Sequence, residues 1–516
     1  MGKHHQMRRR DLTAFVLTVT ELSGVFAPAQ AAPAALRGVD FDFLSRVTYG
    51  PTTSTVADYR REGQRGFIRE LLDGSGQLPP AVQQQIDALE ISHRDGATLL
   101  TDAATEQKRI GNMPDGEERE AARKALNDHA NSLLNETQKR ELLRAMYSPA
   151  QLREQLVWFW LNQFSIHQGK ANGRWLAGDY AEQAVRPHVL GRFADLVMAT
   201  MTHPAMLQYL DNAQSYVGHV NENYARELLE LHTLGVGSGY TQQDVQELAR
   251  ILTGLGVTVT GDRPKVKKEW EALYLRRGDF EFNPARHDFG AKQFLGKRIE
   301  GTGFDEVQQA IDIIVSRPEC AQFVSRRLAT YFVADEPPPA LVERMSRTFQ
   351  KTHGDLRAVM ETLLTSLELV KSAGTKLRDP MQYVIASLRL AYEGRTIVNT
   401  RPIVGWLNSL GEAQFGRVTP DGYPLVSSAW TSSGQMSRRF EIARAIASNA
   451  AGLFQPENGA VPGAPPPPGF PQLASRFYYD AIEPRLGADT RAALARASSQ
   501  AEWNTYLLAS PELNYR

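Results

Sequence analysis

The chain has 516 residues, enough for roughly two to four ordinary domains or for one large helical domain. Its 58 basic and 58 acidic residues give a net charge of zero. This balance excludes the global attraction that non-specific binding to nucleic acids or anionic membranes requires, so we expect no nucleic-acid partner. Cys320 is the only cysteine, which excludes an intrachain disulfide and a multi-cysteine metal site.

The first 31 residues have the order of an export signal. A basic cluster, Arg8 to Arg10, precedes a mostly apolar stretch at 12–26 and the small-residue site Ala29-Gln30-Ala31. The paired arginines indicate the twin-arginine route, and the protein is then periplasmic or secreted. The alternative is a basic N-terminal helix on a cytoplasmic protein. No other stretch approaches 18 consecutive apolar residues, so we expect no transmembrane segment in the mature chain.

Helical signals dominate from residue 40 onward. The turn Gly50-Pro51-Thr52-Thr53 offers threonines that can cap a following helix. Two long helices joined by a polar turn at 111–116 are predicted within 81–147. Further helices are predicted at 150–164, 179–186, 191–201, 221–233, 241–253, 305–316, 318–332, 339–351, 354–369, 380–392, 436–449, 474–484 and 488–508.

Strand signals are few. Residues 257–260 and 279–282 predict at most one small hairpin near 257–282. The proline-rich piece at 462–471 is predicted to be a linker. We therefore expect a mainly α protein with one large helical domain at 40–510, in which 40–150 is a possible N-terminal subdomain.

The helix predicted at 221–233 has one polar face. Asn221 is a suitable N-cap, and at 100° per residue Asn223, Arg226, Glu227 and Glu230 share one arc. This face is either a solvated ladder of ion pairs or the wall of a cleft, in which a carboxylate is a general acid or base. In the second interpretation Asn223 and Arg226 bind an anionic or hydroxylated substrate, and Arg226 and Glu230 are buried together.

Two further clusters carry polar groups suited to chemistry. His287 and Asp288 lie in a loop bounded by proline and glycine, where an adjacent carboxylate can raise the pKa of a histidine. The alternative is a turn capped by Asp288 with an incidental His287. On the helix at 150–167, tryptophans and amides suit stacking against sugar rings, although such tryptophans more often belong to a core. The candidate binding residues there and in the segment that follows are Trp160, Asn162, His167, His203, Asp211 and Asn212.

Metal and cofactor motifs are missing from the sequence. Histidines and acids at 167, 203, 211, 232 and 287 lack the spacing of known zinc or calcium sites. No G-x-S-x-G, Walker or dinucleotide-binding pattern occurs either. We therefore expect neither a metal nor a cofactor.

The order of the motifs resembles one family over roughly residues 40–450, the proteins catalogued as domain of unknown function 1800. The block at 221–235 (NENYARELLELHTLG) matches most closely, preceded by FLSRVTYGP at 43–51 and HPAML at 203–207 and followed by His287-Asp288 and PDGY at 420–423. The resemblance implies an exported, mostly helical protein, often encoded beside a sulfatase-like exported partner, and it implies no established reaction. Gln163 stands where similar proteins usually carry histidine.

Two functional hypotheses remain. The first is an extracytoplasmic hydrolase or lyase acting on a carbohydrate-like or anionic polymer, with Glu227, Glu230, His287 and Asp288 as its catalytic groups. It requires that the glutamates and His287 meet across a pocket walled by the helix at 158–167. The second is a non-catalytic exported protein whose polar helix face binds a partner, such as the sulfatase-like protein.

Overall fold

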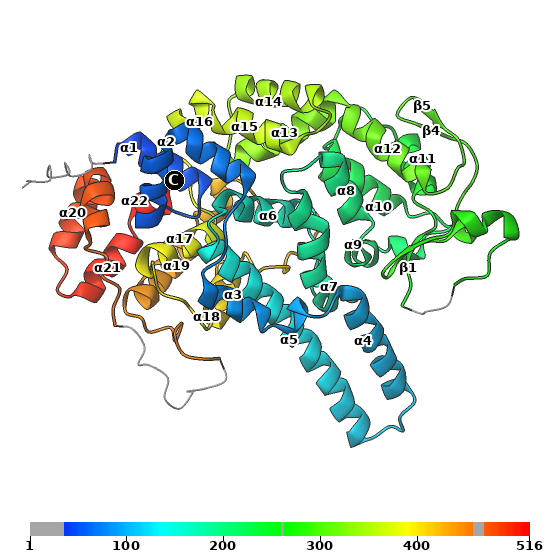
Figure 1. The fold of residues 1–516 in the computed structure, drawn as a ribbon, viewed down its shortest axis with the longest axis horizontal. Coiled ribbons are helices and arrows are strands. Elements are labelled where there is room, and N and C mark those ends of the chain that lie inside the picture. Colours follow the sequence, from blue (N-terminus) through cyan, green and yellow to red (C-terminus); the bar gives the residue numbers. More distant parts are fainter. Residues whose placement is uncertain (1–35, 260–262, 458–468) are drawn as a thin grey trace, which may run out of the picture. The chain divides into compact units, whose positions relative to one another are not determined.

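The computed structural model describes residues 36–259, 263–457 and 469–516. The predicted export signal at 1–31 and most of the predicted linker at 462–471 lie outside these residues. Residues Leu36–Arg516 form one compact unit, in which helices dominate (Figure 1). The mainly α fold class is confirmed.

Eleven α-helices precede the two small sheets in the described sequence. They are α1 (Gly38–Val47), α2 (Thr53–Asp73), α3 (Pro80–Asp87), α4 (Gly96–Gly111), α5 (Glu117–Tyr147), α6 (Gln151–Gln163), α7 (Gly173–Asp179), α8 (Phe193–Met201), α9 (Pro204–Tyr209), α10 (Glu222–Glu227) and α11 (Gln242–Ile251). Two of them continue as π-helical turns, Tyr180–Val185 after α7 and Leu228–Thr233 after α10.

The helices of the second half follow the sheets. They are α12 (Asp305–Ser316), α13 (Pro318–Phe332), α14 (Pro339–Lys351), α15 (Leu356–Leu364), α16 (Leu367–Lys371), α17 (Pro380–Ala391), α18 (Arg401–Ser409), α19 (Ser433–Ala447), α20 (Ala488–Ala495), α21 (Gln500–Leu508) and α22 (Pro511–Asn514). Prolines at the first turn of α13, α14 and α17 set their starts, because proline fits the N1 position where no N–H is needed.

The structure has more strand than predicted. β1 (Leu255–Val257) pairs antiparallel with β3 (Phe280–Phe282), close to the predicted hairpin, and β2 (Leu275–Arg277) adds a third strand in the order β1-β3-β2. A second sheet joins β4 (Lys292–Phe294) to β5 (Lys297–Ile299). The expectation of at most one hairpin near 257–282 is therefore too low.

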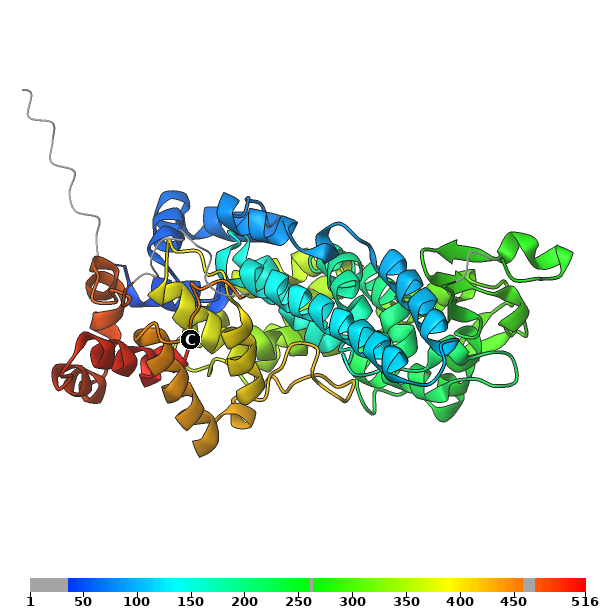
Figure 2. The ribbon, with the colours of Figure 1, turned by 90° about the horizontal axis from the view of Figure 1, so that it is seen from below.

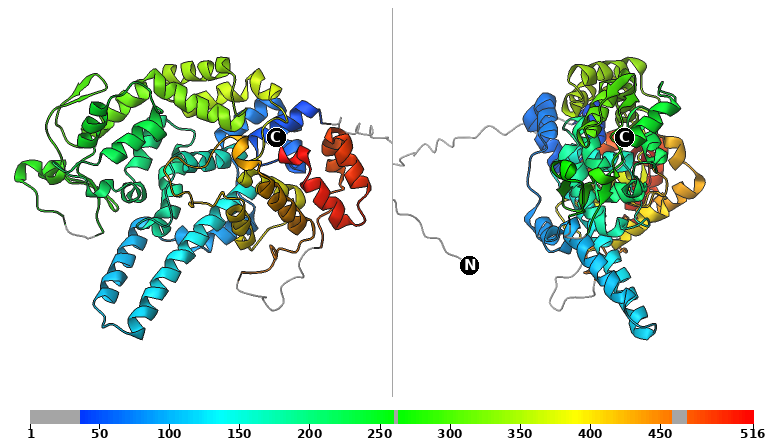
Figure 3. Two further views of the ribbon diagram at one scale, coloured as in Figure 1. Left: turned by 180° about the vertical axis from the view of Figure 1, so that it is seen from behind. Right: turned by 90° about the vertical axis from the view of Figure 1, so that its right-hand side faces the viewer.

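Helices α4 and α5 lie side by side as an antiparallel pair (Figure 2) and extend away from the neighbouring helices (Figure 3). The turn between them falls at the predicted break, where Gly116 begins α5 with φ 157°. Most side chains near this turn are exposed. Only the C-terminal half of α5 enters the interior, with Leu142, Leu143 and Met146 buried.

The buried apolar side chains separate into two hydrophobic cores. Side chains of α2, α6, α8 and α11 to α15 contribute to the first core, among them Phe67 and Leu71 of α2. Side chains from the end of α5 and from α17, α18, α19 and α21 contribute to the second core, among them Met146 and Leu388. Segments from the first 150 residues contribute to both cores, so α2 and α5 lie at their junction.

Candidate functional site

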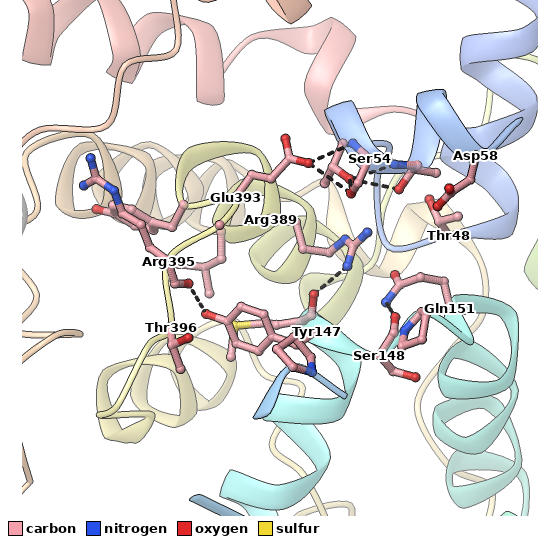
Figure 4. Close-up of a pocket in the computed structure, with 18 of the residues that line it drawn as sticks. Thr48, Ser54, Asp58, Tyr147, Ser148, Gln151, Arg389, Glu393, Arg395 and Thr396 are labelled. Atoms are coloured by element: carbon pink, nitrogen blue, oxygen red, sulfur yellow. Dashed lines mark hydrogen bonds between the residues drawn. The ribbon is translucent and has the colours of Figure 1, made fainter. Parts of the chain in front are cut away.

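A cavity of about 410 Å³ opens where the two cores meet. Figure 4 shows that its walls come from the start of α2, the end of α5 with the loop into α6, and the end of α17. Phe67 and Leu71 supply an apolar floor from the first core, and Met146, Leu388 and Tyr392 supply one from the second. Its polar lining consists mainly of hydroxyl and amide groups, from Thr48, Thr52, Ser54, Thr55, Gln77, Tyr147, Ser148, Gln151 and Thr396. We call this cavity the junction cleft.

Glu393 joins two walls of the junction cleft across 340 residues of sequence. Its carboxylate accepts hydrogen bonds from the backbone N–H groups of Thr53 and Ser54, both at 2.9 Å, and from the Ser54 hydroxyl at 3.1 Å. Partial burial would raise the pKa of Glu393, but the hydrogen bonds from Ser54 and Thr53 hold it below its ordinary value. The free N–H groups at the start of α2 are thus satisfied by this carboxylate.

Arg389 places a cation in the cleft without an acidic partner. Its Nε donates to the carbonyl oxygen of Gly50 at 3.3 Å and its Nη1 donates to that of Met146. Among the described residues it forms no ion pair, and its Nη2 has no hydrogen-bond partner. Burial lowers the pKa of Arg389 to about 10, and the charge of Glu393 offsets this only in part. The side chain is therefore a cation at neutral pH.

The remaining ionic groups of the cleft are engaged at its rim. Asp58 pairs with Arg61 at 2.7 Å, and both side chains are largely exposed. Arg395 donates to the carbonyl oxygen of Gly469 at 3.4 Å. Tyr147 accepts a hydrogen bond from the Ile397 N–H and donates to the Arg395 carbonyl oxygen, both at 2.9 Å, and burial raises its pKa to about 12. None of these cleft residues was among the candidates from the sequence.

The polar helix at 221–233 is amphipathic as predicted. Asn221 caps α10 by accepting from the Tyr224 N–H at 3.0 Å, and Tyr224 is buried while Asn223 is exposed. Arg226 and Glu230 are 3.6 Å apart with side chains 37% and 24% exposed. The expectation that this pair is buried together is wrong, because α10 and its π-helical continuation lie at the surface on this side. Such a pair contributes little to stability.

Glu227 differs from its neighbours electrostatically. Partial burial raises its pKa, and the nearby carboxylates Glu230 and Asp421 raise it further, against the influence of Arg226. Asp421 is itself held by Arg417, with oxygen–nitrogen distances of 2.9–3.1 Å. A raised pKa is what a carboxyl group needs to act as a general acid, so Glu227 has the property that this chemistry uses.

Beneath this surface, two buried polar side chains lie at the π-helical turn, Gln163 of α6 and His232 of the turn itself. Gln163 donates from Nε2 to the Leu231 carbonyl oxygen at 2.6 Å, but its buried Oε1 finds no partner among the described residues. His232 is 2% exposed, and its Nε2 likewise has no hydrogen-bond partner in the described part of the chain. Burial, with a smaller effect of Arg327, lowers the pKa of His232 to about 3, so this histidine is neutral at physiological pH.

His287 is not a surface residue. Its side chain is fully buried, with Nδ1 2.8 Å from the Thr253 carbonyl oxygen and Nε2 2.8 Å from Oε1 of Glu306. Glu306 also accepts from the buried amine of Lys292. Burial would raise the pKa of Glu306, but the hydrogen bonds from His287 and Lys292 hold it below its ordinary value. This triad satisfies its own charges inside the first core.

Asp288 has a different partner from its neighbour His287. Arg250 holds both of its carboxylate oxygens, at 2.8 and 3.1 Å, and lowers its pKa. Cavities of 410, 300 and 470 Å³ lie in the described part of the chain, and none is lined by Glu227, Glu230 or His287. The predicted meeting of these groups across one pocket therefore gains no support from these cavities.

The aromatic helix α6 belongs to the core. Trp160 is 1% exposed and donates from Nε1 to the Val189 carbonyl oxygen at 3.3 Å, so it offers no face for stacking on a sugar. Asn162 exchanges hydrogen bonds with the backbone of Tyr423, at 3.0 and 2.6 Å, and fixes the loop that follows α18. The alternative interpretation of this helix, that its tryptophans are core residues, is the correct one.

The other candidate binding residues have separate local roles. His203 begins α9 by accepting from the Ala205 N–H at 3.1 Å and pairs with Asp179 at 2.9 Å. Asp211 is exposed, has φ 59° and pairs with Lys170, whereas Asn212 is fully buried and donates to the Leu252 carbonyl oxygen. His167 is half-buried.

The fold and the site define a mainly helical protein with a polar cleft between two hydrophobic cores. The family model for proteins of unknown function named DUF1800 matches residues 42–515, and the chain belongs to this family. No curated protein sequence matches the chain, and neither does any solved structure. Within the described residues, no helix combines the length and apolar character that crossing a membrane requires.

Proposed function

We propose that the protein binds a small carbohydrate-like ligand in the junction cleft. The observation that carries this proposal is the composition of a 410 Å³ cavity at the junction of two cores, with hydroxyls and amides set around aromatic and aliphatic side chains. Small-molecule sites are typically concave, roughly 300–1,000 Å³ in volume, and frequent where two packed bodies meet. Sugars suit this lining because their C–H faces pack on aromatic rings while their hydroxyls exchange hydrogen bonds.

A binding role fits the cleft better than catalysis there. The two carboxylates that line it, Asp58 and Glu393, are engaged with Arg61 and with the start of α2. General acid/base catalysis needs groups free to exchange a proton with the substrate. The lining of the cleft therefore favours ligand binding. The hydrolase or lyase reaction predicted from the sequence would need a pair of free carboxylates, and neither Asp58 nor Glu393 is free.

Calorimetric titration with a panel of mono- and disaccharides tests the binding function. We expect at least one sugar to bind the wild type and to raise its melting temperature, since a ligand that binds only the folded state stabilises it. Thr396→Trp fills the cleft and should weaken binding at least about tenfold. Thr365→Trp, at an exposed position after α15, is the matched control and should bind as the wild type does. Equal binding by both variants, or no binding across the panel, would contradict the proposal.

Glu227 favours a second candidate, the hydrolase or lyase acting on a carbohydrate-like or anionic polymer. Its pKa is raised by burial and by Glu230 and Asp421, as a general acid requires. A screen for depolymerised products, run on the wild type and Glu227→Gln, tests this candidate. Activity that falls by roughly 100-fold or more in the variant would support it, and activity that is equal in the two proteins would exclude this role for Glu227.

A further inference from the structure

We propose that the ligand of the junction cleft carries an anionic group, bound at Arg389. This inference rests on the proposed binding function and deepens it by naming an acidic sugar, with a carboxylate or a sulfate ester, as the ligand class. It begins from the charges that line the cleft, of which four are ionic side chains: Asp58, Arg389, Glu393 and Arg395.

Three of these four charges are already used by the protein. Glu393 holds the N–H groups of Thr53 and Ser54 at the start of α2, and Asp58 pairs with Arg61 outside the cavity. Arg395 turns to the Gly469 carbonyl oxygen, and Figure 4 shows its guanidinium away from the centre of the cleft. The start of α2 cannot bind an anion either, because Glu393 occupies it.

Arg389 is the charge that stays available. Figure 4 shows its guanidinium between the labelled side chains of Tyr147 and Ser54, which belong to opposite walls. Carbonyl oxygens of Gly50 and Met146 fix Nε and Nη1, so the orientation of the planar group is set before any ligand arrives. Nη2, with two N–H groups, has no partner in the described residues. The N–H groups of Nη2 can therefore donate charge-assisted hydrogen bonds to an oxygen of a carboxylate or sulfate.

The energetics of Arg389 point in the same direction. Arg389 is half-buried and forms no ion pair among the described residues, and its partial removal from water lowers its pKa to about 10 while leaving it charged at neutral pH. An anionic ligand would supply the missing partner. A neutral sugar can reach the same hydroxyls and amides but offers this cation no ion-pair partner, so the cleft should discriminate between the two.

The test compares three ligands of similar size: glucose, glucuronate and glucose 6-sulfate. We expect at least one of the two anionic sugars to bind the wild type about tenfold or more tightly than glucose, because hydrogen bonds to charged groups are stronger than neutral ones. The two anions separate a carboxylate from a sulfate ligand. Equal affinities for glucose and for both anions would overturn this inference while leaving the binding function intact. No binding of any of the three would overturn both.

Variants assign the preference to Arg389. Arg389→Gln should abolish the preference for the anion, Arg389→Lys should retain part of it by keeping the charge, and Arg298→Gln on exposed β5 is the control that should change nothing. Preference that persists in Arg389→Gln would overturn the assignment. If that variant fails to fold, Arg389→Met replaces it, because it also removes the charge, and a preference for the anion that persists in Arg389→Met would overturn the assignment.

Discussion

At the scale of single residues, Asp279 carries the least favourable charge that the structure describes near the sheets. It is 4% exposed, and its buried Oδ2 has no hydrogen bond from any residue that the structure describes. Burial raises its pKa to about 6; Arg276 opposes this, and Asp95 and Asp179 raise the pKa further. Between the ordinary pKa near 4 and the raised value, the folded state holds a proton that the unfolded state has lost. Folding stability therefore falls as the pH rises through this window.

Replacing this carboxylate by an amide should stabilise the protein. We expect Asp279→Asn to raise the free energy of unfolding at pH 7 by on the order of 1–2 kcal/mol, with the gain disappearing below about pH 4, where the wild-type carboxyl is protonated in both states. Urea unfolding at the two pH values measures the difference. Asp288→Asn is the control of opposite sign, because Arg250 lowers the pKa of Asp288. A loss of stability in Asp279→Asn at pH 7 would refute this account of the residue.

The candidate site residues show what sequence spacing can predict. The spacing at 221–233 groups Asn223, Arg226, Glu227 and Glu230 on one polar face, and none of these four side chains is fully buried. It could not tell whether Glu227 and Glu230 face solvent or a cleft, since that depends on Asp421, nearly 200 residues further on. The alternative of an incidental His287 is wrong. Its partner Glu306 comes from a later helix, and Lys292, which also contacts Glu306, comes from a later strand, so no local pattern around the loop predicts the burial of His287.

At the scale of elements, long helices were predictable and short strands were not. The predicted bounds of α12, α13 and α14 agree with the structure, because apolar periodicity marks all three helices and a first-turn proline also marks the starts of α13 and α14. The helix predicted at 354–369 is instead two, α15 and α16, divided at Thr365 and Ser366. Strands of three residues, such as β4 and β5, are too short for a period of two to be recognised.

The start of α2 depends on a residue that no local pattern reveals. Glu393 satisfies the N–H groups of Thr53 and Ser54 from beyond the end of α17. Removing it in Glu393→Ala should destabilise the protein by about 1 kcal/mol at pH 7, as the loss of a helix cap does. Since the folded-state pKa of Glu393 is lowered, this contribution is present above pH 4.5 and fades as the pH falls through the folded-state value.

Thermal unfolding of Glu393→Ala at pH 7 and near pH 3 measures this contribution. Glu343→Ala is a matched control, because Glu343 forms an exposed pair with Arg347 on α14 and should cost less. Equal losses in the two variants would mean that the connection between α17 and α2 adds nothing to an ordinary surface pair.

At the scale of the whole molecule, the junction cleft is a product of tertiary structure. Its lining comes from residues 48–79, 146–151 and 388–396, and each segment taken alone has an ordinary structural interpretation. Thr52 is a helix cap, Tyr147 ends a long helix, and Arg389 is one of many arginines. Only the packing of the two cores against each other brings these three segments together, and no motif in the sequence predicts this packing.

The central claim is that the junction cleft holds an acidic sugar at Arg389. The most direct measurement is a crystal structure of the protein with glucuronate or glucose 6-sulfate. The account predicts one ligand in the cleft, with an oxygen of its anionic group within about 3.2 Å of Nη2 of Arg389. A ligand bound at the surface of Glu227 and Asp421, or in the cleft with its anionic group directed away from Arg389, would contradict it.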